Sequence, residues 1–357
     1  MLTGWLGCPH KQRKIIGIIG MLRCASVGLG WWGGEHAAAI HRKSDRICIA
    51  ACHTDSGNAA VDAATLREFA EKYGARPFER FDDLLSDPDV DALIVTTPHS
   101  SHVPQIVAAA QAGKHVFVEK PLSITVESGR RALDTCRQHR VVLAVGHNRR
   151  FSNALAAIKK IVNDDTLGTI LHAEAHFSWP GGLTYPKGYW RTDMTEAPAG
   201  AMTATCIHMI DSFAYLLGPI DRVVAAYAKH RAVPHGIEDT TTLLVEFRSG
   251  PTGYIGGTIA APDMSCLNIY GSAASVYAGI DEEQVTLHRA DGPRKALEIP
   301  ILEQSDTLRL ELEEFARACA GEVQFRVDPK DALNNIAVME AALSAIRSGT
   351  AVTVKSE

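Results

Sequence analysis

The segment "HVFVEKPLS" (115–123) ends an apolar, strand-like run with two opposite charges. Glu119 and Lys120 follow the run and Pro121 comes next, so the segment does not continue as a buried strand. An ammonium group at such a strand end can donate a hydrogen bond to a hydroxyl or carbonyl oxygen and can favour the alkoxide that precedes loss of hydride. A surface Glu–Lys pair is the structural alternative. Because X–Pro bonds tolerate the cis form, we predict a cis bond before Pro121 that aims the lysine.

A second stretch, "VGLGWWGG", has the glycine spacing of a phosphate-binding turn, with Gly28, Gly30 and Gly33 between a predicted strand and a predicted helix. The first glycine permits a tight turn, the second lets the backbone approach a pyrophosphate, and the third lets helix and strand pack closely. The helix N-terminus then offers N–H groups and a positive dipole end to the phosphates. We therefore expect a dinucleotide here rather than a merely tight turn. The intervening residues expected to contact it are Leu29, Trp31 and Trp32.

The end of the next predicted strand, "IAACHTDSG", should hold a ribose of that dinucleotide. An acidic residue is usual about 20 residues after the glycines, but His53 and Thr54 occupy the position. Asp55 is expected instead to cap a helix that starts near Asn58. Without the acid, repulsion of a 2′-phosphate is removed, so NAD and NADP both remain possible.

Polar residues also follow other predicted strands. The stretch "TTPHSSH" lies at the end of the strand 92–97, and ligands of open parallel sheets bind at the carboxyl ends of strands. Asn148 lies where the chain leaves the last strand of the same sheet. The expected cofactor contacts from these segments are Thr96, Thr97, Pro98, His99, His102, Glu119, Lys120 and Asn148.

The elements that position these residues fall into two groups. Residues 21–147 alternate apolar strands (23–27, 46–52, 92–97, 115–118, 141–145) with amphipathic helices (34–43, 58–73, 101–112, 124–139), which predicts a doubly wound parallel sheet, a Rossmann domain. Residues 148–357 are predicted to form an α+β domain with a large open, mostly antiparallel sheet. Residues 1–20 are expected to be a poorly ordered extension.

The composition argues against several kinds of partner. Of the 357 residues, 46% are apolar and 22% charged, and the net charge is −5 with scattered basic residues, which argues against a nucleic-acid or membrane surface. No apolar run reaches the roughly 20 residues of a membrane span. The eight cysteines contain no CxxC pair, so we expect free thiols in a reducing, cytoplasmic compartment and no metal site.

Several motifs together resemble the Gfo/Idh/MocA (glucose–fructose oxidoreductase / inositol dehydrogenase) family. They are the glycine turn, Thr97-Pro98 with His102, "AGKHVFVEKPLS" at 112–123, "GHNRRF" at 146–151, and a helix ending in "HMIDSFAYLLG". The resemblance implies NAD(P)-dependent oxidation of a secondary alcohol of a sugar or cyclitol, or the reverse reaction. It implies that the C-terminal domain binds substrate and forms a homodimer or homotetramer through its sheet. It also implies that His208 takes the hydroxyl proton while Lys120 polarises the same oxygen.

One position departs from the family pattern. The family usually carries Asp four residues before the histidine, and this chain has Ala204 there. A carboxylate one helical turn away could orient the imidazole or bind a substrate hydroxyl. Its loss weakens an inositol-like assignment and is consistent with a dihydrodiol or carbocyclic acid dehydrogenase. A glycoside-cleaving enzyme that uses tightly bound NAD transiently and a non-catalytic NAD(P)-binding sensor are further alternatives.

Weaker candidates for substrate contact lie in the second half of the chain. In "LHAEAHFSW" the polar residues His172, Glu174, His176 and Ser178 share one strand face, and a polar sheet face or subunit interface is favoured over metal binding. "YPKGYWR" combines an aromatic ring with a guanidinium, which suits recognition of anions or hydroxyls. The candidates are His176, Ser178, Trp190, Arg191 and Thr205.

Overall fold

Two compact units make up the chain in the computed structural model, which describes residues 20–279, 284–290, 292, 295–296 and 305–355. Unit 1 extends to Ser123 and adds Glu127–Gly146 and Asp306–Pro329. Unit 2 comprises Ile124–Val126, His147–Ser305 and Lys330–Glu357. Within the described ranges, no helix is long and apolar enough to cross a membrane. Apart from Gly20, the expected extension lies outside these ranges.

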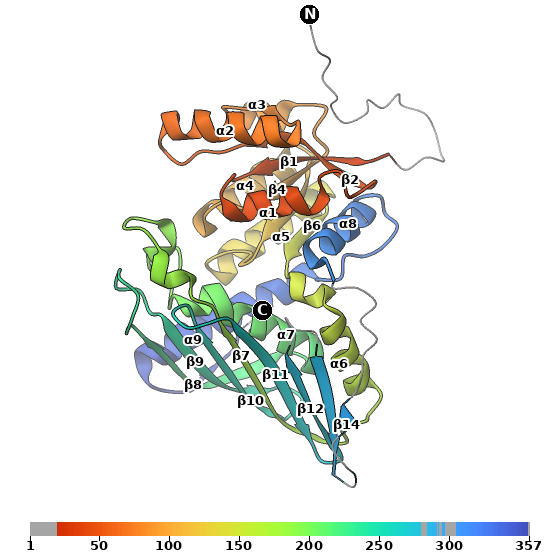
Figure 1. Ribbon diagram of the computed structural model, residues 1–357, viewed down its shortest axis with the longest axis vertical. Helices are drawn as coiled ribbons and strands as arrows, with labels where there is room; N and C mark the ends of the chain where they lie inside the picture. Colours follow the sequence, from red (N-terminus) through yellow and green to blue (C-terminus); the bar gives the residue numbers. More distant parts are fainter. Residues whose placement is uncertain (1–19, 280–283, 291, 293–294, 297–304, 356–357) are drawn as a thin grey trace, which may run out of the picture. The chain divides into compact units, whose positions relative to one another are not determined.

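Unit 1 is a doubly wound parallel sheet, as the alternation of strands and helices predicts (Figure 1). Its strand order is β3-β2-β1-β4-β5-β6, and the pairings are parallel. The order reverses between β1 and β4, and ligands of such sheets bind at this switch point, beyond the carboxyl ends of the strands. The elements are β1 (Leu22–Val27), α1 (Trp31–Ile40), β2 (Ile47–His53), α2 (Ala59–Tyr73), β3 (Arg76–Pro77), α3 (Phe81–Ser86), β4 (Ala92–Val95), α4 (His99–Gln111), β5 (His115–Glu119), α5 (Val126–His139), β6 (Leu143–Gly146) and α8 (Thr307–Cys319).

Local signals account for most boundaries in unit 1. Gly74 and Gly113 adopt positive φ just beyond α2 and α4, where glycine avoids a Cβ clash. The expectation that Asp55 caps α2 is wrong: the side chain of Asn58 accepts the N–H of Val61 at 3.3 Å. Asp55 instead accepts the N–H of Gly57 at 3.1 Å within the preceding turn. The Lys120–Pro121 peptide bond is cis, as predicted.

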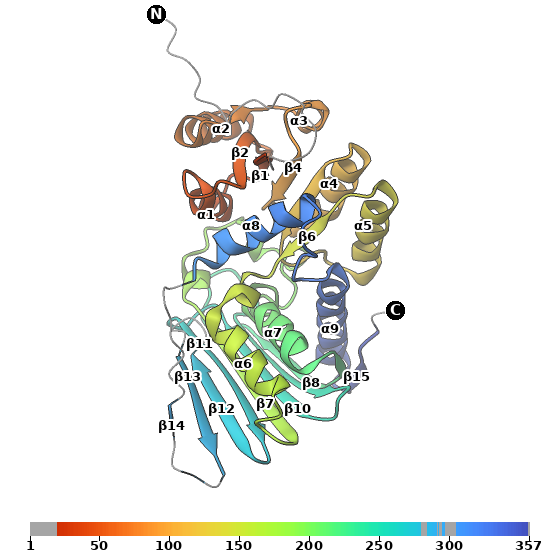
Figure 2. The ribbon, with the colours of Figure 1, turned by 90° about the vertical axis from the view of Figure 1, so that its right-hand side faces the viewer.

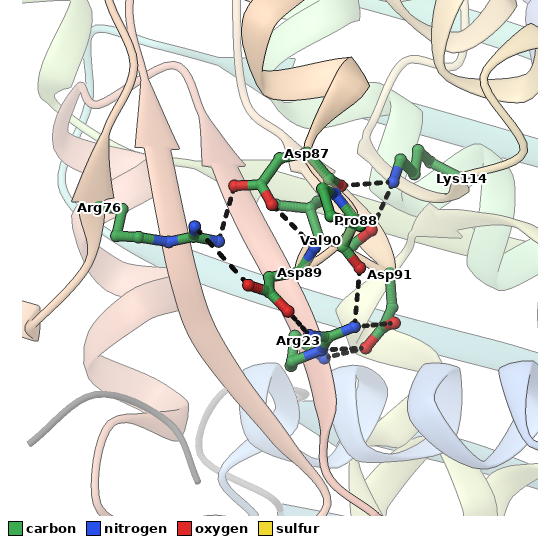
Figure 3. Close-up of polar contacts among 8 residues, drawn as sticks. All are labelled: Arg23, Arg76, Asp87, Pro88, Asp89, Val90, Asp91 and Lys114. Atoms are coloured by element: carbon green, nitrogen blue, oxygen red, sulfur yellow. Dashed lines mark hydrogen bonds and ion pairs between the residues drawn. The ribbon is translucent and has the colours of Figure 1, made fainter. Parts of the chain in front are cut away.

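The amino ends of the strands in unit 1 are cross-linked by charged side chains (Figure 3). Arg23 of β1 pairs with Asp89 at 2.5 Å and Asp91 at 2.9 Å, in the segment that leads into β4. Lys114, directly before β5, donates to the backbone oxygens of Asp87 and Val90 at 2.8 and 2.7 Å. These charges tie neighbouring strand starts together, so their role is structural.

Helix α8 comes from the end of the chain and belongs to unit 1, where it packs on α1, β2 and β5. Its buried stripe includes Leu312, Phe315 and Ala316, and the ring of Phe315 lies 5.8 Å from that of Phe117 on β5. The stripe also carries Glu311, a carboxyl group on the buried face of the helix.

Unit 2 is built around a nine-stranded sheet of order β14-β13-β12-β11-β7-β10-β9-β8-β15. The β7–β10 pairing is parallel, and the other pairings among the described strands are antiparallel. Its elements are η1 (Asn148–Phe151), α6 (Asn153–Asn163), β7 (Ile170–Ser178), η2 (Gly181–Thr184), η3 (Trp190–Thr192), the π-helical turn η4 (Met202–Cys206), α7 (Ile207–Leu217), β8 (Ile220–Lys229), β9 (Thr240–Phe247), β10 (Thr252–Thr258), β11 (Met264–Gly271), β12 (Ala274–Gly279), β13 (Gln284–Arg289), β14 (Lys295–Ala296), α9 (Pro329–Ser348) and β15 (Val352–Thr353).

Helices α6, α7 and α9 lie on one face of this sheet (Figure 2). Apolar side chains of α7 and of the turn before it are buried in this core: Met202, Ile207, Ile210, Phe213 and Leu217. On β9, Leu243 faces the core while its neighbour Leu244 is 45% exposed, because successive strand residues point to opposite faces. Tyr227 and Met264, 63% and 51% exposed, lie on that second face.

Six described cysteines are free thiols: Cys24, Cys52, Cys136, Cys206, Cys266 and Cys319. Cys48 on β2 is disulfide-bonded, so the expectation of free thiols throughout is wrong at this position.

Candidate active site

The glycine turn between β1 and α1 has the geometry its sequence predicts. Gly28 has φ +91°, and a Cβ there would lie 2.9 Å from backbone atoms of Thr96 on the neighbouring strand end. A Cβ on Gly33 would lie 2.2 Å from the carbonyl oxygen of Gly28. The hydroxyl of Thr96 donates to the same oxygen at 2.6 Å, so Thr96 supports the turn. Backbone conformation and close packing therefore require two of the three glycines.

Gly30 is different, because a Cβ added there would meet no described atom within 4 Å. Packing thus gives no reason for glycine at this position, whereas backbone approach to a pyrophosphate does. Gly30 is also the N-cap of α1, no side chain caps the helix, and its first turn carries no acidic residue. Its N–H groups are suited to phosphate oxygens. Leu29 is buried, while Trp31 is 67% exposed beside the turn.

His53 ends β2, at the position expected for ribose contact. Its ring is buried, and Nδ1 donates to the carbonyl oxygen of Phe78 at 2.9 Å. The ring also lies 5.5 Å from that of Phe81. Nδ1 is therefore engaged within the protein, and the next residue, Thr54, is half-buried.

The polar residues after β4 form hydrogen bonds mainly with other groups of the protein. The hydroxyl of Thr97 bonds to Gln105 Oε1 at 2.7 Å. His102 is fully buried, with Nε2 3.0 Å from the carbonyl oxygen of Thr97 and Nδ1 2.8 Å from that of Pro121. It links the end of β4 to the segment that follows Lys120. His99 is buried, its ring 5.7 Å from that of His102, and Pro98 is the N-cap of α4.

Lys120 is held from both sides at the carboxyl end of β5. On one side, the preceding Glu119 accepts the backbone N–H of Lys120 through Oε2 at 3.1 Å, and it contacts His36 Nε2 through Oε1 at 2.7 Å. On the other side, His102 binds the carbonyl oxygen of Pro121. Burial opposes ionisation of Glu119, but the hydrogen bond and charge of His36 and the charge of Lys120 lower the pKa of its carboxyl. Glu119 thus contacts protein groups through both oxygens.

His208 lies in the first turn of α7, directly after the π-helical turn η4. Such turns are frequent at functional sites. Its ring packs at 5.7 Å, edge to face, against Phe177 of β7. Ser212, one helical turn on, donates to the backbone oxygen of His208 at 2.8 Å.

Asp211 faces a buried network in unit 2. It accepts two hydrogen bonds from Arg150, at 2.9 and 2.8 Å, and one from Asn335 at 2.9 Å. Burial disfavours its charge, yet His147, Arg150 and Asn335 lower the pKa of the carboxyl. Sequence reasoning missed Arg150 and Asn335, because no local pattern marks a buried arginine or its partner.

The weaker substrate candidates separate into two groups. Thr205 and Ser178 are buried, and their hydroxyls donate at 2.8 Å to the carbonyl oxygens of Ala201 and Pro262. Half-buried His176 has a pKa lowered by burial, and the guanidinium of Arg191 stacks 4.3 Å from the ring of Trp190. Asn148 begins η1 and is half-buried.

The position without the family's carboxylate sits in an apolar cluster. Ala204 packs against a cluster of five buried residues, and Trp179 and Tyr189 pack against the same cluster, which consists of Tyr185, Ala201, Val233, Ile237 and Ile259. An ionised carboxylate here would lose hydration against apolar side chains. The surroundings in this chain therefore fit alanine.

A Rossmann unit with an open glycine turn and a second unit with a large sheet are the architecture of a dinucleotide-binding oxidoreductase. Residues 22–147 match the family model for the oxidoreductase family with an NAD-binding Rossmann fold, and residues 155–277 match the GFO/IDH/MocA C-terminal domain. The chain belongs to the Gfo/Idh/MocA family.

Individual relatives agree with this assignment. The chain is 28% identical over 341 residues to scyllo-inositol 2-dehydrogenase (NAD(+)) of Bacillus subtilis, covering 93% of this chain and 96% of the relative. It is 28% identical to myo-inositol 2-dehydrogenase of Thermotoga maritima, covering 76% and 80%. A crystal structure of a candidate NADPH-dependent oxidoreductase from Desulfitobacterium hafniense superposes with a TM-score of 0.85 at 26% identity, covering 94% of this chain and 99% of that one.

Proposed function

We propose that this chain transfers hydride between NAD and a secondary alcohol or ketone of a sugar- or cyclitol-like molecule, with Lys120 as the residue that acts on the reacting oxygen. The two relatives named as inositol dehydrogenases support the substrate class. The placement of Lys120 carries the proposal: it follows β5, next to the strand pair at the switch point, and both flanking residues are fixed by hydrogen bonds.

Each residue then has a defined task. The N–H groups at the start of α1, opened by Gly30, bind the pyrophosphate. The bound dinucleotide supplies the hydride acceptor or donor. Lys120 donates a hydrogen bond to the substrate oxygen and stabilises its developing negative charge, and the imidazole of His208 takes the hydroxyl proton. Arg191, His176 and Trp190 are proposed to contact the rest of the substrate.

We propose NAD rather than NADP as the preferred cofactor. No acid stands at His53 itself, but the charged residues that follow it through residue 62 are Asp55 in the turn and Asp62 in the first turn of α2. A 2′-phosphate near this segment would still meet negative charge from these two carboxylates without a compensating cation from the segment. Asp55→Asn should therefore raise kcat/KM for NADP relative to NAD, and an unchanged ratio would contradict this preference.

We also propose a cytoplasmic homo-oligomer formed through the uncovered face of the large sheet. Tyr227, Leu244 and Met264 expose apolar area on that face, which a second copy would bury. The six free thiols support a reducing compartment, and the disulfide at Cys48 argues against one. Light scattering tests the oligomer, and cell fractionation tests the location.

The deciding experiment measures NADH formation with a panel of polyols, sugars and sugar acids. Lys120→Ala should lower turnover by about 10² or more, because one electrostatic donor contributes that much. Lys114→Ala is the matched control. It removes a lysine at the other end of the same strand, where the ammonium donates to the backbone oxygens of Asp87 and Val90, and it should leave turnover nearly unchanged.

Three other outcomes decide between functions. Near-native turnover of Lys120→Ala would refute its role. Glycoside cleavage without accumulation of NADH would indicate transient use of bound NAD. Tight binding of NAD with no turnover on any substrate would indicate a sensor.

A further inference from the structure

Three ionisable side chains from separate elements meet inside unit 1. They are His36 of α1, Glu119 of β5 and Glu311 of α8. One ring nitrogen of the histidine and one carboxyl oxygen of each glutamate lie within 4.8 Å of one another. The residues are 0%, 6% and 0% exposed. We call them the buried triad. Sequence reasoning identified Glu119 alone, because the other two lie in unremarkable helical segments.

The surroundings of the buried triad are apolar. The ring of Phe117 lies 5.4 Å from that of His36, and Phe315 packs against Phe117. Both carboxyl oxygens of Glu311 are buried and have no hydrogen-bond partner among the described residues. Two carboxylates this close in such an environment repel strongly, so one of them holds a proton.

The hydrogen bonds show which carboxyl group is charged. Both oxygens of Glu119 accept, one from His36 and one from the backbone N–H of Lys120, and these bonds stabilise an anion. Glu311 accepts no such bond from any residue that the structure describes. Burial and the charge of Glu119 raise the pKa of Glu311 well above its ordinary value, in agreement with this division.

We propose that Glu311 is a neutral carboxylic acid whose proton keeps Glu119 ionised, and that Glu119, braced by His36, is the positioning residue that fixes Lys120. If Glu311 lost its proton, the added negative charge would work against the anion that holds the N–H of Lys120. The positioning part rests on the proposed role of Lys120, whereas the protonation of Glu311 does not.

The neighbouring elements supply few other charges. Helix α8 packs on α1, β2 and β5, and among the described residues the ionisable groups grouped with Glu311 are His36 of α1 and Glu119 of β5. Lys120, directly after β5, acts on the carboxyl of Glu119 through its charge. The ionisable groups of β2 are Cys52 and His53, and Nδ1 of His53 binds the carbonyl oxygen of Phe78. Burial raises the pKa of the Cys52 thiol to about 12, so this thiol carries no charge near neutral pH.

The first experiment compares the pH dependence of unfolding for the wild-type chain and Glu311→Gln. Glu311 has a raised pKa in the folded state, so above about pH 4.3, the ordinary value, the unfolded chain releases a proton that the folded chain keeps. As the pH rises above this value, the unfolding equilibrium constant of the wild-type chain should increase relative to that of the variant by up to tenfold per pH unit. Near pH 4 and below, the two chains should show the same pH dependence.

Hydrogen exchange of α8 and β5 peptides gives the readout for unit 1. Glu313→Gln, the same change at a half-buried position two residues on, is the control and should show no such slope. An infrared band of a protonated carboxyl group, absent in Glu311→Gln, should accompany the slope. Parallel pH curves for wild type and Glu311→Gln, or one equivalent of a metal ion bound to the purified chain, would overturn the assignment of the proton.

The second experiment tests positioning. Glu119→Gln should lower kcat by about 10², as a displacement of about 1 Å can, while the Kd for NAD changes little. The limb of the pH–rate profile set by Lys120 should move to lower pH, because a neighbouring negative charge is gone. Unchanged kcat and pH profile in a folded Glu119→Gln, alongside an inactive Lys120→Ala, would refute positioning; if Lys120→Ala is fully active, the proposed function fails instead.

Discussion

Replacement of Asp211 by asparagine should destabilise unit 2 far more than the same replacement at Asp331. Both carboxylates bind Arg150, which is 2% exposed. Asp211 is 1% exposed and accepts two bonds from the guanidinium, whereas the side chain of Asp331 is 49% exposed and accepts one at 3.0 Å. The two substitutions are therefore chemically identical and differ in the burial of the carboxylate that they remove.

The expected magnitudes follow from that difference. Breaking a buried ion pair by removal of one partner costs about 3–5 kcal/mol, because the remaining charge stays in the interior. An exposed pair contributes about 0–1 kcal/mol. Asp211→Asn should thus raise the opening equilibrium of unit 2 by about 10² to 10⁴, and Asp331→Asn by less than about tenfold.

The pH dependence adds a second test. The pKa of Asp211 is lowered in the folded chain, so its contribution is present above the unfolded value of about 3.9 and is lost as the pH falls. The loss of folding stability caused by Asp211→Asn should therefore become smaller in acid. Hydrogen exchange of α7 and α9 peptides measures unit 2 separately from unit 1. Equal losses of stability in the two variants, or a loss in Asp211→Asn that does not change with pH, would refute this reasoning.

Three further predictions concern other parts of the chain. Gly33→Ala should fail to fold or lose stability because its Cβ would lie 2.2 Å from a backbone oxygen, whereas Gly30→Ala should melt normally but bind NAD at least tenfold more weakly; calorimetry separates these outcomes. Arg23→Met should lower the free energy of unfolding by about 1–3 kcal/mol, the worth of its hydrogen bonds to charged groups, without changing kcat; a loss of turnover in the folded variant would contradict the structural role in Figure 3. Burial raises the pKa of Cys206 to about 12 and also raises that of half-buried Cys266, so iodoacetamide at pH 8 should label Cys266 first, and mass spectrometry would expose the reverse order.

The sequence predicted the parts of the fold that local patterns determine. Apolar runs bounded by glycines marked the parallel strands, and the glycine turn and the cis bond before Pro121 were both predicted from short motifs. The packing of α8 on unit 1 could not be predicted, because an amphipathic stripe shows that a helix is buried but not which sheet it covers. The partners of Asp211 come from residues 61 and 124 positions away in the chain, and no spacing rule relates them.

The two charges at the end of β5 have different environments, and that difference explains why a core strand can end in them. The carboxylate of Glu119 turns inward and is satisfied by His36 and by the backbone N–H of the next residue. Pro121 cannot donate to a sheet, but its carbonyl oxygen can accept, and His102 binds it. The backbone on either side of Lys120 is thereby fixed by side chains of other elements, while its own side chain belongs to neither bond. A lysine in a solvated loop would need neither a buried anion on one side nor a buried histidine on the other. The free-energy cost of burying these two polar groups is therefore best explained by a requirement to fix the position of Lys120.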